Sequence, residues 1–93
     1  MPNVINATPQ SIKIEYLLDT LFGVNALTSE CMAQMVSKAP SVQLRLTPPW
    51  PAQLKHAHRI AFEWDGSAYR GVVQHAELMP GGDLLLDIDT AGQ

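Results

Sequence analysis

Alternation of apolar and polar residues is clearest in the last third of the chain, where it predicts a meander of antiparallel strands. A first strand is expected over 59–64, because three of its apolar side chains share one face at the strand period. Asp65-Gly66 follows, a dipeptide that suits the tight turn of a hairpin. The return strand is expected over 68–78. The three apolar residues of the first strand are Ile60, Phe62 and Trp64.

The length of the turn decides which side chains meet across this hairpin. A two-residue loop sets Phe62 opposite Tyr69, and it sets His58 opposite Val73. A four-residue loop shifts the pairing but keeps the aromatic residues and Val73 on one face. A three-residue loop reverses the faces and would place Arg70 beside the aromatic residues, so we disfavour it.

A third strand completes the meander. Met79–Gly82 has proline and glycine at the two central positions of a type II turn. In the strand that follows, Asp87 and Asp89 fall on the face opposite the leucines, which is typical of the solvated side of an edge strand. A separate short strand is expected over 42–46, where apolar residues also alternate. The inward residues of the third strand are expected to be Leu84, Leu86 and Ile88.

The N-terminal part of the chain favours a helix. Thr8-Pro9 is a typical start, because threonine caps exposed amides and proline is tolerated at the first helical position. Gly23 stands where glycine commonly ends a helix. A short strand over 12–16 is the alternative, but we prefer the helix because its ends and its apolar spacing agree. The residues with the i, i+3, i+4, i+7 spacing of one buried face are Ile14, Leu17, Leu18 and Leu21.

A second helix is expected to begin at Thr28, with Leu27 and Met32 placed to pack across its cap. Pro40 would end it, because a proline disfavours helical geometry at the preceding residue. The two helices would form an αα-hairpin. The sequence thus predicts an α+β fold, in which an N-terminal αα-hairpin packs on a roughly four-stranded antiparallel sheet whose last three strands form the meander. The buried stripe of the second helix would be Met32, Met35, Val36 and Ala39.

Three prolines surround Trp50 within 48–51 and prevent a continuous strand there. We expect Trp50 to plug the rim of the protein's own core rather than to serve as a polyproline II ligand for a partner. Two alternatives stay open for residues 51–58. They either begin the first meander strand early or form one helical turn that runs through Leu54 and Ala57.

Composition limits the class of protein. The 93 residues suffice for a single small globular domain, to which residues 1–7 would be a mobile lead-in. Hydrophobic residues make up 46% and charged residues 16%, which excludes a disordered chain. We find no apolar run near the roughly 18–20 residues of a membrane span, and no signal peptide. Cys31 is the single cysteine and fits a reducing compartment, so a cytoplasmic protein is expected.

The charge distribution argues against binding to nucleic acid. The formal net charge is −3, with basic residues in the middle of the chain and an acidic C-terminal end. A nucleic-acid-binding surface requires dense positive charge. Lys55, Arg59 and Arg70 are the candidates for such a surface, but they are scattered in an acidic chain. Nucleic-acid binding is therefore not expected.

The three histidines are the candidate metal ligands. If the meander strand already includes His56, the favoured register gathers the histidines and Glu77 at one end of one face. Imidazole and carboxylate groups suit zinc, and three protein ligands plus water describe an open hydrolytic geometry. The H-x-H spacing is a weak signal, and on a helix the same side chains would diverge. A zinc-binding domain with hydrolytic activity is therefore the alternative function, with His56, His58, His75 and Glu77 as ligands.

The sequence identifies no catalytic group. Cys31 has no histidine nearby in the sequence and nothing that would supply an oxyanion hole, so we expect a structural thiol. We therefore lean toward a protein that is not an enzyme.

The middle strand of the meander supplies the main functional hypothesis, because it is apolar on both faces. Val73 lies with the aromatic residues, and a second apolar set lies behind it. Two short helices can cover only one face of a sheet, and an uncovered apolar face commonly marks a contact with another protein. We expect a small non-enzymatic protein-interaction or adaptor domain, acting as a two-fold homodimer without membrane contact. The interface would contain Val72, Ala76 and Leu78.

Overall fold

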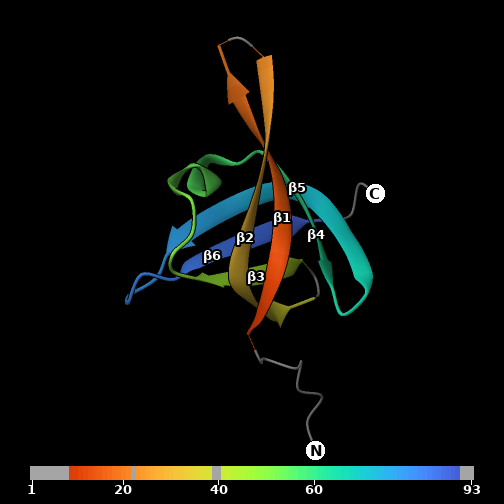
Figure 1. Ribbon diagram of the computed structural model, residues 1–93, viewed down its shortest axis with the longest axis vertical. Helices are drawn as coiled ribbons and strands as arrows, with labels where there is room; N and C mark the ends of the chain where they lie inside the picture. The colour runs from red at the N-terminus through yellow and green to blue at the C-terminus, as the bar shows by residue number, and fades with distance from the viewer. Residues whose placement is uncertain (1–8, 22, 39–40, 91–93) are drawn as a thin grey trace, which may run out of the picture.

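The computed structural model describes residues 9–21, 23–38 and 41–90. In this part of the chain, six antiparallel strands close into a barrel in the order β1-β2-β3-β6-β5-β4 (Figure 1). None of the helices in the described residues is long and apolar enough to cross a membrane. The elements are β1 (Gln10–Thr20), β2 (Gly23–Ser37), β3 (Val42–Thr47), the 3-10 helix η1 (Ala52–His56), β4 (Arg59–Trp64), β5 (Ser67–Leu78) and β6 (Leu84–Asp89).

The predicted αα-hairpin, and with it the α+β fold, is wrong. The two segments form β1 and β2, which pair from Gln10 opposite Ala33 to Thr20 opposite Gly23. Burial follows a period of two rather than a helical period, because strand pairing overrides weak helical propensity. The residues that point into the barrel are Ile12, Ile14 and Tyr16 from β1 and Cys31, Ala33 and Met35 from β2.

The expected helix boundaries have other roles or are not described. Gly23 has a φ of 117° and lies at the turn between β1 and β2, so its backbone freedom serves a hairpin rather than a helix end. Thr28 lies within β2. Thr8, Pro40 and the expected lead-in over 1–7 lie outside the described residues.

The predicted meander is present as β4, β5 and β6. Asp65 and Gly66 have φ values of 51° and 79°, and this two-residue turn sets Phe62 opposite Tyr69. The two rings stack with centroids 5.4 Å apart. The expected type II turn also forms, since the Gly82 N–H donates to the Met79 carbonyl oxygen at 3.1 Å and Gly81 has a φ of 92°.

Closure of the barrel corrects the expected edge strand. β6 pairs with β5 on one side and with β3 on the other, so it is an interior strand. Asp87, which the sequence placed on a solvated edge, accepts a hydrogen bond from the Ser41 hydroxyl at 2.6 Å. The short strand expected over 42–46 is confirmed as β3.

The segment between β3 and β4 forms the helical turn that was one of the two alternatives. Leu54 of η1 is fully buried, and Ala57 follows it into the core. Trp50 packs against this core, and its indole N–H donates to the Gly82 carbonyl oxygen at 2.9 Å. The expected position of Trp50 at the rim of the protein's own core is confirmed.

The barrel interior is entirely apolar in the described residues: no polar or charged residue there is buried. Every strand but β5 contributes fully buried or nearly buried side chains, and the hydrophobic effect of this single core is the main stabilising term. The largest members are Trp64, Ile14, Met35, Leu44, Leu46, Leu54, Leu84, Leu86 and Ile88.

Candidate interaction surface

The hairpin of β1 and β2 is longer than the barrel that it belongs to, and its end projects from the barrel wall (Figure 1). β4 pairs with β1 over Ile14–Leu17, and β3 pairs with β2 over Met32–Ser37. Residues 18–27 therefore have strand partners only within the hairpin, as far as the described residues show. We call residues 18–27 the ribbon; Phe22 within it lies outside the described residues.

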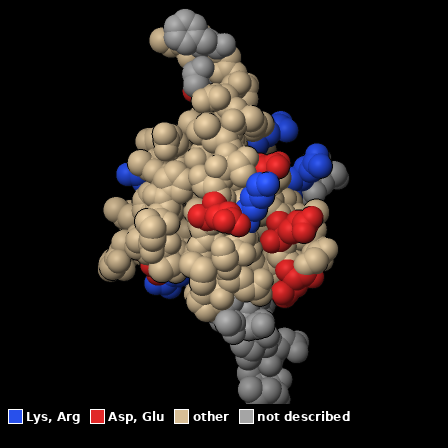
Figure 2. Space-filling model, viewed as in Figure 1, with Lys and Arg blue, Asp and Glu red and all other residues tan. Residues whose placement is uncertain are grey.

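The ribbon exposes apolar side chains that the barrel does not cover. Leu21 is 98% exposed and Val24 is 63% exposed. Asp19 is the one charged residue of the ribbon. Figure 2 shows the charged side chains gathered over the barrel, while the projecting part is almost free of them on this face. A two-stranded hairpin is marginally stable by itself, so an apolar ribbon of this kind gains from being covered.

One edge of the hairpin is open. Beyond the β3 pairing, the segment Val24–Glu30 of β2 makes no backbone hydrogen bond to a described residue other than those to β1. We call Val24–Glu30 the free edge. Proline, bulges and charged residues commonly prevent an edge strand from pairing with another chain; the free edge contains no proline and no bulge, and its one charged residue, Glu30, lies at its end.

A hollow of about 770 Å³ lies at the base of the ribbon on the outer face of the wall. Its lining includes two rows of residues that run across neighbouring strands, with the row of Leu27, Tyr16, Ile60 and Gly71 between them. The first row contains Ala26, Leu17, Arg59, Val72 and Asp89, each opposite the next. The second row contains Thr28, Glu15, Ala61 and Arg70.

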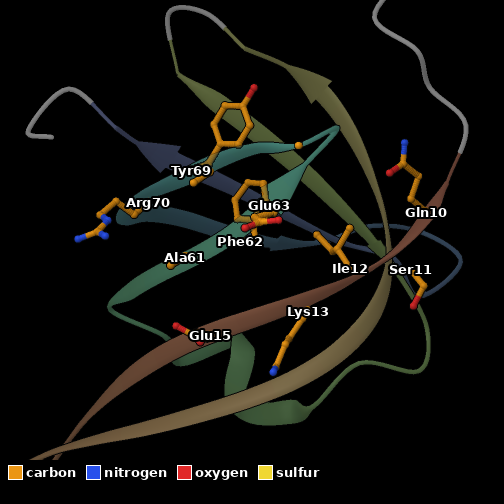
Figure 3. A pocket seen from close by; sticks show the side chains of 12 residues that line it. Gln10, Ser11, Ile12, Lys13, Glu15, Ala61, Phe62, Glu63, Tyr69 and Arg70 are labelled. Atoms are coloured by element: carbon orange, nitrogen blue, oxygen red, sulfur yellow. The ribbon is translucent and has the colours of Figure 1, made fainter.

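A second hollow of about 560 Å³ continues the first along the wall and shares Glu15, Ala61 and Arg70 with it (Figure 3). The guanidinium groups of Arg59 and Arg70 make no ion pair or hydrogen bond to a described residue. Two carboxylates, Glu15 and Asp89, line the same hollow. Because the charges balance, the hollow has no net preference for an anion or a cation.

A bulge divides the three predicted interface residues. The pairing of β5 with β6 shifts between Val73 and His75, so that one residue is inserted and the side chains beyond it change faces. Val72 remains on the outer wall, in the hollow. Ala76 packs against the core, and Leu78 is 58% exposed at the end of β5. The three residues do not share one face, and an interface at Leu78 stays a prediction.

The structure does not gather the predicted metal ligands. His56 ends η1, and His58 lies exposed before β4. The bulge turns His75 to the outer wall, where its Nε2 lies 3.8 Å from Oε1 of Glu77. In the described part of the chain, no group of three or more His, Cys, Asp or Glu residues could hold a metal ion.

Cys31 is 3% exposed on the inward face of β2. Burial raises the pKa of its thiol, because desolvation disfavours the thiolate. A raised pKa is the opposite of what a catalytic nucleophile requires. The placement agrees with a structural thiol.

The ribbon is the feature that sequence reasoning missed. Its signal was the alternation of Ile12, Ile14 and Tyr16, which supports a strand, followed by apolar residues on both faces from Leu17 onward. The spacing of Leu17, Leu18 and Leu21 also fits one face of a helix. A two-stranded ribbon with two exposed faces has no polar side to mark its period, so it resembles a helix in the sequence.

No protein-family model, curated protein or solved structure matches this chain.

Proposed function

We propose that this chain is a small, non-enzymatic protein-interaction domain that forms a homodimer through the β1–β2 ribbon. The observation that carries the proposal is the exposure of Leu21 and Val24 on a projection that holds a single charged residue. The core is complete without these side chains. Stability of the barrel therefore does not account for their apolar character, whereas contact with another chain does.

The hollow at the base of the ribbon supports the same surface. Ala26 of its first row belongs to the ribbon, Leu17 adjoins the ribbon, and Val72 extends the apolar floor onto β5. Arg59 and Asp89 lie among them in the same row. Polar groups interleaved with apolar ones suit an interface that forms and dissociates, because the surface also remains soluble when it is uncovered.

A charge at Val24 is expected to dissociate the dimer. Val24→Asp removes an apolar contact from each subunit, and a loss of about 1.5 kcal/mol per site weakens association roughly a hundredfold. The molar mass from light scattering, measured over a series of concentrations, should fall from that of a dimer to that of a monomer. Circular dichroism should show the same β content in both proteins.

Leu78→Asp is the matched control, because Leu78 is exposed to a similar degree but lies on β5. This variant should remain a dimer. A monomeric native chain at all concentrations would contradict the proposal. So would dissociation by Leu78→Asp with no effect of Val24→Asp, which would move the interface to β5.

A further inference from the structure

We propose that two copies of this chain join along the free edge of β2, in an antiparallel register with Leu27 on the two-fold axis. The pairing would make one continuous sheet from both hairpins. The inference rests on the proposed homodimer and specifies how its two subunits meet. It follows from the direction of backbone groups, from symmetry and from charge.

One hydrogen bond fixes which backbone groups of β2 point outward. The His58 N–H donates to the Leu17 carbonyl oxygen at 2.8 Å, so the backbone of Leu17 faces the β4 side. The direction of the backbone N–H and C=O groups alternates along a strand, so these groups of Tyr16 and Leu18 point toward β2. Their partners Leu27 and Asn25 face β1 in return. The backbone N–H and C=O groups that point away from β1 therefore belong to Val24, Ala26, Thr28 and Glu30.

Two-fold symmetry then selects the register. In an antiparallel homodimer centred on Leu27, Val24 lies opposite Glu30 of the second copy, and Ala26 lies opposite Thr28. This register pairs all four outward residues of each edge. If the two-fold axis passed two residues to either side of Leu27, part of the free edge would stay unpaired, or the pairing would extend into the segment that already pairs with β3.

Side chains and charge agree with this register. Glu30 is the one charged residue of the free edge, and here it faces Val24 rather than its own copy. Asn25 lies opposite Ser29, which places an amide beside a hydroxyl. Leu27 of one copy lies opposite Leu27 of the other. This side chain already packs against the core of its own barrel from the inner face of the hairpin. No like charges meet along the edge.

The register also covers the ribbon. The tip of each ribbon, which comprises residues 19–24, extends past Glu30 of the second copy toward its barrel. Leu21 is the most exposed apolar side chain of the described residues, and this arrangement places it beside the partner barrel. The exposed tip and the open edge are thus parts of one contact.

Cross-linking tests the register directly. In a Cys31→Ala background, Leu27→Cys places two thiols opposite each other at a non-hydrogen-bonded pair, where the backbone separation permits a disulfide. Under mild oxidation most of the Leu27→Cys chain should run as a covalent dimer on a non-reducing gel. Asn25→Cys is the matched control, because its thiol would face Ser29 of the second copy and should form little cross-link. Equal cross-linking of the two variants would overturn the register.

Ala26→Pro tests the pairing along the free edge without a cross-linking reaction. It removes one outward N–H and leaves the ladder with β1 intact, so the barrel should keep its circular dichroism while the dimer dissociates at least tenfold more readily. Ala26→Ser retains the N–H and should remain a dimer. If Val24→Asp dissociates the native dimer but Ala26→Pro does not, edge pairing is wrong while self-association stands. A native chain that is monomeric at all concentrations overturns both.

Discussion

Replacing Trp64 with alanine should lower the free energy of unfolding by about 3–5 kcal/mol, because it empties the largest side-chain volume in the barrel core. Trp64 is 2% exposed at the end of β4 and belongs to the single apolar cluster that all six strands surround. A domain of this size has about 5–15 kcal/mol of stability in total. Urea unfolding followed by circular dichroism measures the loss, since the substitution removes a fluorescent residue.

Two milder variants separate this effect from the loss of a tryptophan as such. Trp64→Phe keeps most of the apolar volume and should cost less than Trp64→Ala. Trp50→Phe, at the rim, loses the hydrogen bond to the Gly82 carbonyl and should cost about 1 kcal/mol. A Trp64→Ala protein as stable as Trp50→Phe would contradict a core organised inside a closed barrel.

Removing the ribbon tip should strongly weaken self-association and leave the barrel folded. Replacing Asp19–Val24 with Asn-Gly joins Leu18 to Asn25, a pair that already lies opposite in the hairpin and suits a two-residue turn. The deletion takes away Leu21 and Val24, neither of which contributes to the core. We expect association to weaken by at least roughly a hundredfold by light scattering, since the deletion of Leu21, Phe22 and Val24 from each chain removes six apolar side chains per dimer.

The stability of the shortened protein distinguishes the ribbon from a structural element. Its free energy of unfolding should change by less than about 1 kcal/mol, because the tip is paired only with itself. The double variant Leu21→Met, Val24→Ile keeps the tip apolar and should remain a dimer. A shortened chain that unfolds, or one that still dimerises with native affinity, would be incompatible with the ribbon as an interaction surface.

The sequence pattern correctly predicted the strands that have one polar face and one apolar face. Ile60, Phe62 and Trp64 alternate with two charged residues and an alanine, and the turn at Asp65-Gly66 fixes their register with Tyr69. Here local pattern and tertiary structure agree. The predicted strand β3 and the turn before β6 succeeded for the same reason.

The N-terminal part failed where this contrast is weak. Met32 and Val36 lie outside the barrel at 44% and 46% exposure, while Ala33 and Met35 lie inside. Apolar residues on both faces of β2 produced a spacing that also fits a helix. Barrel closure could not be predicted either, because the pairing of β1 with β4 and of β3 with β6 joins strands that are distant in sequence.

The candidate site was predicted only in part. Homodimerisation was inferred from an apolar face of the sheet, and Val72 does lie on the outer wall beside the ribbon. Ala76 was misplaced on that face, because the bulge after Val73 turns it toward the core. A bulge inserts one residue into a continuous strand and leaves no mark in the hydrophobic pattern of β5.

Amide hydrogen exchange along β2 tests self-association through the ribbon most directly. In dilute monomer, the amides of Asn25, Leu27 and Ser29 should be protected by β1, and their neighbours should exchange freely. At concentrations where light scattering shows a dimer, the amides of Val24, Ala26, Thr28 and Glu30 should become protected as well, so that the alternation disappears. If these four amides exchange equally fast at both concentrations, the free edge of β2 is not the surface at which two copies meet.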